Sequence, residues 1–247
     1  MLTHPTLSQL DQLGLAGMAK AFEELQDNPE VKALDHAEWL GLLLDREVTQ
    51  RNDRKLKSRL RAAKLRFTQA CVEDLDLTTA RGLDRRLMAE LSACNWIREH
   101  HNLILTGPCG TGKTWLACAF GQQAARSELT VLYHRVPRLF AALALAHGDG
   151  RHPRLFRALC RIDLLILDDW GPEPMTASQR RDILEIVEER YGRGSTLVTS
   201  QIPVARWFDV VAEPTFADAI LDRLVHNAHK IELKGESLRK TPKKIEP

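Results

Sequence analysis

The residues that decide the fold stand at positions 103–114, which read Leu-Ile-Leu-Thr-Gly-Pro-Cys-Gly-Thr-Gly-Lys-Thr. The last eight match the pattern G-x-x-x-x-G-K-[ST], in which glycines let backbone N–H groups turn toward a phosphate at a helix N-terminus. An apolar strand before the loop and an Ala-rich helix after it supply the context that the pattern requires. We expect Lys113 to reach the β- and γ-phosphates of a nucleotide and the Thr114 hydroxyl to ligate Mg²⁺. The predicted cofactor-binding residues are Gly107, Pro108, Cys109, Gly110, Thr111, Gly112, Lys113 and Thr114.

A second motif, Asp-Leu-Leu-Ile-Leu-Asp-Asp over residues 163–169, is an apolar run that ends in two acids. A buried parallel strand would place Asp168 at the carboxyl edge of the sheet, beside the phosphate loop, where its carboxylate can hold Mg²⁺. Asp168 and Thr114 are therefore the predicted metal ligands. Asp169 is the candidate that orients or deprotonates the attacking water.

From about residue 100 onward, short β-type runs alternate with helical patterns. Strands are predicted at 103–106, 131–134, 163–167, 195–200 and 230–233, and helices at 113–125, 137–147, 153–159, 178–191 and 215–227. Such alternation predicts parallel strands joined by right-handed crossovers, a doubly wound α/β layer. Because one strand separates the two motifs, the pattern matches the additional-strand P-loop ATPases, with a five-stranded sheet of order 5-1-4-3-2. The guanine-reading pattern Asn-Lys-x-Asp does not occur in the sequence, so ATP is favoured over GTP.

The first 70 residues are predicted to form a separate, entirely helical domain, and residues 71–95 a connector within the α/β domain at 71–247. Apolar residues spaced from position 7 to position 25 predict one helix. Asp35 and Glu38 have the spacing of a capping box that opens a second helix. Its apolar stripe is predicted to continue as far as Phe67.

The charge of the N-terminal region is strongly segregated. Residues 1–45 contain two Lys against eight acidic residues, whereas residues 46–66 contain nine Lys or Arg against two acidic residues. Such a basic block is expected of a protein that binds the phosphate backbone of nucleic acid. A solvated helix face is the alternative. The predicted DNA-binding residues are Arg51, Arg54, Lys55, Lys57, Arg59, Arg61 and Lys64.

The composition excludes several classes of protein. With 247 residues, 44% of them hydrophobic and 28% charged, the chain is expected to be globular and not disordered. Its five scattered cysteines include no CxxC pair, which argues against a disulfide scaffold or a zinc ribbon and favours the reducing cytoplasm. The sequence contains neither a secretory signal pattern nor an apolar run of membrane-spanning length, so we expect no membrane partner.

Several runs together resemble one family. GPCGTGKTWLA, VLYHRVPRLF, LLILDDWG, TLVTSQIP, ADAILDRLVHNAHKIEL and GESLRK resemble the IstB family of transposition helper ATPases, which are AAA+ proteins related to the DnaC helicase loaders. The similarity extends to HAEWLGLLLDREVTQRNDRKLKSRLRAAKLR and so covers nearly the whole chain. It implies an AAA+ P-loop NTPase core preceded by a small all-α domain. Since only residues 234–247 follow the fifth predicted strand, the usual helical lid is expected to be reduced or absent.

The resemblance also implies roles for individual residues. The polar sensor-1 group falls at Ser200 or Gln201, and we favour Gln201, whose amide can reach a γ-phosphate or its water. Arg223 matches the arginine finger that stabilises transition-state charge in a neighbouring subunit. Arg239 has a sensor-2-like place. Asp169 stands where AAA+ proteins commonly have Glu, so hydrolysis is expected to be slow or assembly-dependent, and Glu173 is a possible substitute.

The resulting functional prediction is an ATPase, stimulated by assembly and by DNA, that helps an insertion-sequence transposase. The family implies that ATP and Mg²⁺ drive formation of a homo-oligomer on double-stranded DNA, largely independent of sequence, and that this assembly recruits the transposase. One alternative is a DnaC-like loader whose N-terminal helices hold a replicative helicase. A second alternative is a scaffold that binds ATP without turnover.

Overall fold

The computed structural model describes residues 5–26, 34–77 and 81–238. The chain divides into two compact units, Met1–Ser58 and Arg59–Pro247, which are described separately. This boundary lies within helix α3 (His36–Ala63), because the residues that follow the helix pack with the second unit: Leu65 lies against Gly121. The functional division at residue 70 stays a prediction. Within the described residues, no helix is both long and apolar enough to cross a membrane.

The first unit is helical. It contains α1 (Pro5–Gln12), α2 (Ala16–Gln26) and the first part of α3. The prediction of a single helix over positions 7–25 is wrong, because the chain breaks between α1 and α2, where Gly14 has a φ of 70°. A small apolar cluster holds these helices together, with Phe22 and Trp39 packed edge to face at a centroid distance of 5.6 Å.

Helix α3 begins as predicted and ends earlier. The Glu38 amide donates to Asp35 Oδ1 at 2.8 Å, and the Asp35 amide donates to Glu38 Oε2 at 3.1 Å, so the capping box is confirmed. The helix ends at Ala63 because Lys64 adopts a left-handed φ of 52°. The expected continuation of the apolar stripe to Phe67 is therefore wrong. Lys64 and Phe67 belong to the segment after the helix.

The second unit is built on a five-stranded parallel sheet. Its strands are β1 (Asn102–Thr106), β2 (Val131–Arg135), β3 (Leu164–Trp170), β4 (Ser195–Ser200) and β5 (Ala228–Glu232). They lie in the order β2-β3-β4-β1-β5, so the predicted order 5-1-4-3-2 is confirmed. The central strands β1, β3 and β4 are almost continuously buried, as expected of a parallel sheet covered on both faces.

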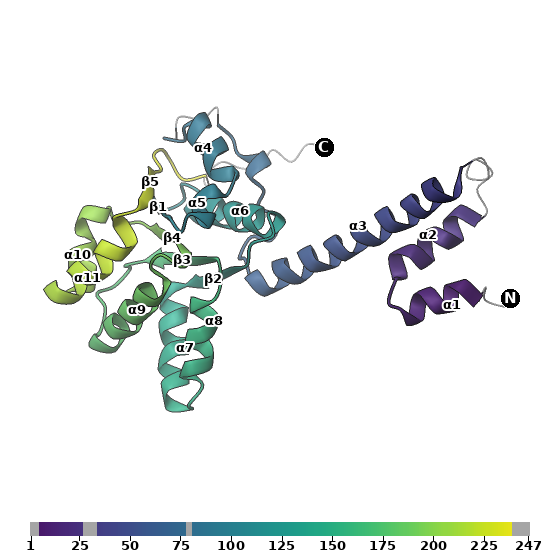
Figure 1. Ribbon diagram of the computed structural model, residues 1–247. Coiled ribbons are helices and arrows are strands. Elements are labelled where there is room, and N and C mark those ends of the chain that lie inside the picture. Colours follow the sequence, from purple (N-terminus) through teal and green to yellow (C-terminus); the bar gives the residue numbers. More distant parts are fainter. Residues whose placement is uncertain (1–4, 27–33, 78–80, 239–247) are drawn as a thin grey trace, which may run out of the picture. The chain divides into compact units, whose positions relative to one another are not determined.

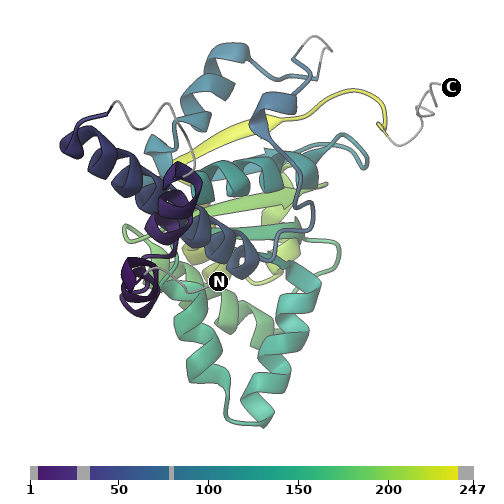
Figure 2. The same ribbon diagram turned by 90° about the vertical axis from the view of Figure 1, so that its right-hand side faces the viewer.

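Helices cover both faces of the sheet (Figures 1 and 2). On one face lie α4 (Arg85–Ser92), α5 (Asn95–Arg98) and α6 (Lys113–Arg126), preceded by the short 3-10 turn η2 (Val72–Asp74). On the other face lie α7 (Val136–Gly148), α8 (His152–Cys160), α9 (Ala177–Arg190), η3 (Val204–Arg206), α10 (Trp207–Val211) and α11 (Pro214–Val225). This second face packs into one large apolar core that includes Trp170 and Trp207. Because the helices bury the middle of the central strands, the polar side chains of these strands lie at the strand ends.

Candidate active site

The phosphate loop joins the carboxyl end of β1 to the N-terminus of α6. Gly107, Gly110 and Gly112 have φ values of 139°, 88° and 93°, which L side chains rarely adopt. Thr111 is buried, and its hydroxyl donates to the Pro108 carbonyl at 3.0 Å, closing the loop on itself. The sequence motif therefore has the backbone geometry that a phosphate cradle needs.

The basic and hydroxyl side chains of the loop point to the same edge of the sheet. The Lys113 ammonium donates to the Gly107 and Pro108 carbonyls, both at 2.7 Å. The Thr114 hydroxyl, at the first turn of α6, donates to Asp168 Oδ1 at 2.8 Å. The two predicted metal ligands are thus in direct contact, although 54 residues separate them in sequence.

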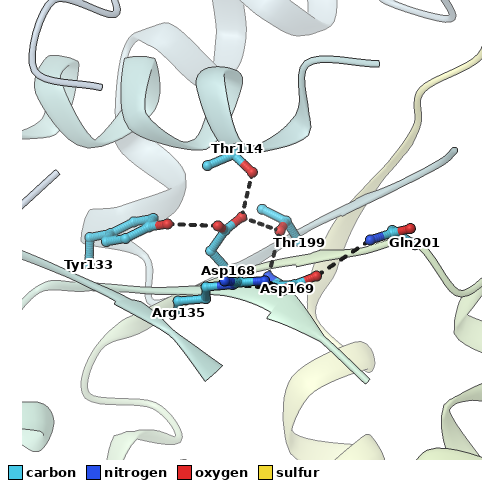
Figure 3. Close-up of polar contacts among 7 residues, drawn as sticks. All are labelled: Thr114, Tyr133, Arg135, Asp168, Asp169, Thr199 and Gln201. Atoms are coloured by element: carbon cyan, nitrogen blue, oxygen red, sulfur yellow. Dashed lines mark hydrogen bonds and ion pairs between the residues drawn. The ribbon is translucent and has the colours of Figure 1, made fainter. Parts of the chain in front are cut away.

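Asp168 accepts hydrogen bonds from several side chains of the site, as Figure 3 shows. Its side chain is buried, and besides Thr114 it accepts hydrogen bonds from Thr199 at 2.6 Å and from Tyr133 at 2.7 Å. Burial and the hydrogen bond to this carboxylate raise the pKa of Tyr133, so its phenol stays a proton donor at neutral pH. Groups from α6, β2 and β4 therefore fix both oxygens of one carboxylate at the carboxyl end of β3.

A backbone irregularity separates the two acids of the motif. Pairing of β3 with β4 runs from Leu167 opposite Val198 to Trp170 opposite Ser200, which leaves one extra residue on β3. Asp169 lies in this bulge with a left-handed φ of 65°, and its amide donates to Thr199 Oγ1 at 3.1 Å. Bulges re-aim side chains, and here the bulge turns the Asp169 carboxylate toward the cleft, away from the contacts of Asp168.

The Asp169 carboxylate lies between the end of β2 and the residue that follows β4. Arg135, the last residue of β2, donates to Asp169 Oδ2 through Nε at 2.9 Å and through Nη2 at 2.7 Å. Gln201 Nε2 approaches Asp169 Oδ1 at 3.5 Å. The ion pair with Asp169 raises the pKa of the Arg135 guanidinium. One oxygen of the candidate catalytic carboxylate is thus engaged by a cation, and the other faces the predicted sensor-1 amide (Figure 3).

These residues line one cleft of about 420 Å³. Of the predicted residues, it includes Cys109, Gly110, Gly112, Lys113, Thr114, Asp168, Asp169, Ser200 and Gln201. Between the two sensor-1 alternatives, Gln201 is exposed toward the cleft, whereas Ser200 is fully buried and donates to the Trp170 carbonyl at 2.8 Å. The exposed Glu173 is not part of this lining, which favours Asp169 over it.

The cleft has further walls that the sequence motifs did not indicate. They are Arg66, Phe67, Trp115, Arg135, Thr199 and Leu238. Arg135 and Tyr133 could have been found, because β2 lies beside β3 and its carboxyl end must share the edge of the site. Thr199 stands next to the predicted Ser200 and Gln201, but only its contacts show its role. Nothing in the sequence indicated Arg66 and Phe67, which follow the left-handed Lys64.

The segment after β5 lies against the phosphate loop. The Leu233 amide donates to the Thr106 carbonyl at 2.7 Å, and the Leu238 amide donates to the Gly110 carbonyl at 3.0 Å. A Cβ at Gly110 would lie 2.0 Å from Ser237 Oγ, so the loop glycine is also needed for this close approach. Within the GESLR run, Ser237 and Leu238 therefore pack against the phosphate loop. Arg239, with its suggested sensor-2 role, lies outside the described residues.

The donor set fits a magnesium nucleotide. Mg²⁺ binds oxygen ligands octahedrally at 2.0–2.1 Å, which places neighbouring ligands about 2.9 Å apart. Thr114 Oγ1 and Asp168 Oδ1 are 2.8 Å apart, so these two residues would hold the ion. The glycine cradle at the start of α6 and the Lys113 ammonium fit the phosphates. The residues present thus match the predicted cofactors.

Arg223 lies at the other end of the strands. The side-chain Nδ2 of Asn102, at the start of β1, donates to the carbonyls of Arg223 and Leu224 at 2.9 and 3.2 Å. The Arg223 guanidinium pairs with Glu188 at 2.9 Å and donates to the Ala219 carbonyl. Because the phosphate loop follows the carboxyl end of β1, Arg223 is not part of its own chain's cleft.

The predicted DNA-binding residues fall into two groups. Arg51 pairs with Glu47 at 2.6 Å, and Arg59 pairs with Glu128 at 3.6 Å and is mostly covered. Arg54, Lys57 and Arg61 follow helical spacing along one side of α3 and are exposed. Lys55 is also exposed on α3, and Lys64 lies beyond its end. All of these cations except Lys64 therefore lie on one helix.

Known proteins resemble this chain along nearly its whole length. A family model described as IstB-like ATP-binding protein matches residues 8–245. The chain is 59% identical over 244 residues to the insertion sequence ATP-binding protein y4pL of Sinorhizobium fredii, covering 99% of each chain. It is 33% identical to the insertion sequence IS21 ATP-binding protein of Pseudomonas aeruginosa, covering 93% of this chain and 86% of that one. The DnaC helicase loader superposes with a TM-score of 0.56 at 18% identity, over 67% of this chain and 97% of that chain, which shows a shared fold.

Proposed function

This chain belongs to the family of IstB-like ATP-binding proteins of insertion sequences, and we propose that it is an ATPase that prepares target DNA for a transposase. Its AAA+ P-loop fold is the one that the sequence resemblance implies. The observation that carries the proposal is the contact of Thr114 with Asp168, beside the bulge that aims Asp169 into the cleft. These residues bring a phosphate cradle, an oxygen-ligand pair and a candidate base to one edge of the sheet.

Each side chain has a part in phosphoryl transfer to water. Mg²⁺, held by Thr114 and Asp168, would neutralise charge on the β- and γ-phosphate oxygens. Lys113 leaves the loop carbonyls to contact the phosphates. Asp169 orients the attacking water and accepts its proton through Oδ1, the oxygen that Arg135 does not engage. Gln201 donates to the same water or to a γ-phosphate oxygen.

The ion pair with Arg135 is the inactive arrangement of Asp169. While both donors of Arg135 contact Oδ2, the ion pair occupies one oxygen and restricts rotation of the carboxylate toward an attacking water. The basal rate is therefore expected to be low. Assembly or DNA would raise the rate if it draws Arg135 away from Asp169.

Arg223 acts in a second copy of the chain. An arginine finger must reach a developing negative charge, and Arg223 faces away from its own cleft. In a homo-oligomer it would leave Glu188 and enter the neighbour's nucleotide site. ATP binding and assembly are coupled in this way, because each site is complete only at an interface.

Helix α3 provides the duplex-binding surface. Arg54, Lys57 and Arg61 would contact phosphates, which gives affinity with little sequence preference. The assembly on DNA then recruits the transposase, which supplies strand transfer. Phosphate release after hydrolysis resets the assembly.

The test is ATP binding and phosphate release by the full chain, measured with and without plain duplex DNA at low salt. We expect ATP binding, slow basal release and faster release with duplex. Lys113→Ala should abolish ATP binding, whereas Lys230→Ala, which removes an exposed lysine of β5, should behave as the parent protein. Tight ATP binding with no release under any condition would instead support the nucleotide-gated scaffold. Release that duplex DNA does not change, in a protein that does not bind duplex, would support the helicase-loader alternative.

A further inference from the structure

Three helices on the face of the sheet that carries α7 to α11 bring two imidazoles and a carboxylate together. His147 lies in the last turn of α7, His152 is the first residue of α8, and Asp182 lies in α9. Their ligand atoms all lie within 4.8 Å of one another. Among the described residues, this is the only group of three or more His, Cys, Asp or Glu side chains so arranged.

The distances suit a tetrahedral ion. Zn–N and Zn–O bonds of about 2.0–2.1 Å place neighbouring ligand atoms of a tetrahedron about 3.3 Å apart. His147 Nε2 is 2.8 Å from Asp182 Oδ1, and His152 Nε2 is 3.8 Å from the same oxygen. Both separations lie within about half an ångström of the tetrahedral edge. The two rings are stacked, with centroids 3.9 Å apart and an interplanar angle of 18°, so the more exposed His147 ring must turn for both nitrogens to point at one ion.

Burial and charge point to a cation. The Asp182 side chain is only 8% exposed, and among the described ion pairs its partners are His147 and His152, with no Lys or Arg. A buried carboxylate needs a compensating positive charge beside it. A divalent ion would supply this charge and use both imidazole lone pairs at once. Since the His147 ring is about half exposed, the ion could enter from solvent.

We propose that His147, His152 and Asp182 bind a divalent transition-metal ion of the zinc type, with water in the fourth position. Three protein ligands with one open position are a common zinc arrangement. None of the three residues lines the nucleotide cleft, so this site is separate from the magnesium position at Thr114 and Asp168. The ion ties the turn between α7 and α8 to α9. Its binding therefore stabilises the second unit whether or not the protein hydrolyses ATP.

The test uses the full chain, stripped with chelator and free of nucleotide and Mg²⁺. Co²⁺ titration should give one visible-absorbing four- or five-coordinate site per chain, without the near-ultraviolet band of a thiolate ligand. Zn²⁺ should displace Co²⁺ and raise Tm by about 5–10 °C at roughly hundredfold excess over its Kd. Absence of both the absorption and the Tm shift would overturn the proposal.

Variants locate the site. His147→Gln and His152→Gln should each remove the Co²⁺ absorption and the Zn²⁺-dependent shift, and Asp182→Asn should do the same if it folds. His101→Gln is the matched control, because His101 is similarly exposed, lies 3.7 Å from the Glu99 carboxylate and has His229 nearby. Loss of binding in the control, or binding that survives in either His147→Gln or His152→Gln, would show that the ion binds elsewhere. Since both glutamine variants change partly exposed side chains, their folding can be checked by Tm without metal.

Discussion

The nucleotide cleft and the cationic length of α3 are both rich in charge, yet their charges are held in opposite ways. In the cleft, Asp168 is buried and accepts three hydrogen bonds from three different elements. On α3, Arg54, Lys57 and Arg61 are exposed side chains of one helix. The hydrogen bonds in the cleft hold individual atoms in place. Helix α3 determines only how many positive charges lie along one side.

This difference determines how each region responds to change. A carboxylate held by three partners loses its function when one atom moves, because catalysis depends on geometry at the scale of an ångström. A surface that binds phosphates through long, flexible side chains loses affinity gradually, one contact at a time. Single substitutions should therefore act sharply in the cleft and mildly on α3.

The largest effect is expected for Arg223→Ala. If Arg223 completes a neighbour's site, the variant should bind ATP nearly normally and lose about 10³–10⁵ in hydrolysis rate. A mixture with Lys113→Ala should regain part of the activity, because a mixed interface pairs an intact phosphate loop with an intact arginine. ATP binding and phosphate release of each variant and of the mixture are the measurements.

Glu188→Gln is the matched control for Arg223. It breaks the 2.9 Å ion pair with Arg223 but leaves the guanidinium available. We expect its hydrolysis rate to equal or exceed that of the parent protein. An Arg223→Ala protein that hydrolyses ATP at the parent rate would make Arg223 a structural residue of α11.

The next effect is expected for Asp169→Asn. Asn tolerates the left-handed backbone of the bulge and keeps an oxygen for Arg135, so the fold should be unchanged. Removing the base should lower phosphate release by about 10²–10⁴ while ATP binding persists. Glu173→Gln, which changes an exposed carboxylate outside the cleft, should leave the rate as it is. If the two variants behave the other way round, Glu173 is the base.

A smaller, graded effect is expected on α3. Replacing Arg54, Lys57 and Arg61 by Gln should weaken duplex binding for all sequences and reduce the log–log salt slope by ~0.9 per contact, about 2.7 in total. The control replaces Arg46, Arg51 and Arg59 by Gln and so removes the same amount of charge. These three residues differ in having ion pairs, with Glu24, Glu47 and Glu128 respectively. Equal slopes for both triple variants would mean that net charge alone, and not this side of the helix, governs binding.

The same contrast explains what the sequence could predict. The glycines, Lys113, Thr114 and Asp168 were predictable because a contiguous motif and a buried strand determine their positions. The position of Asp169 depends on a bulge that no local pattern reveals. Arg135 and Tyr133 come from the neighbouring strand, so only the predicted strand order could have indicated them. Residue spacing alone also missed the break at Gly14 and the end of α3 at Lys64, because both depend on a single left-handed φ. The cluster of His147, His152 and Asp182 joins three helices and appears only once they pack.

The smallest effect tests whether the helical unit also contains a fixed charge. Glu47 in α3 is buried, and its Oε2 accepts from the Gly17 and Met18 amides of α2 at 2.7 and 3.1 Å, while Oε1 accepts from Arg51. Glu47→Gln keeps the shape but loses the charge-assisted bonds, which should cost about 1–3 kcal/mol of local stability. Hydrogen exchange at the amides of α2 should become faster, whereas the second unit should not change.

The pH dependence has a defined sign. The hydrogen bond from Arg51, followed by those from the α2 amides, lowers the pKa of Glu47 below its usual 4.5. This contribution is therefore fully present above pH 4.5 and is lost as the pH falls through the lower pKa of the folded state. Glu24→Gln is the control, because Glu24 has exposed pairs with Lys20 and Arg46 that contribute about 0–1 kcal/mol. If both variants leave the exchange of α2 unchanged down to pH 4.5, then Glu47 is not a fixed charge, and the contrast between a locked cleft and a tolerant helix applies to the whole first unit.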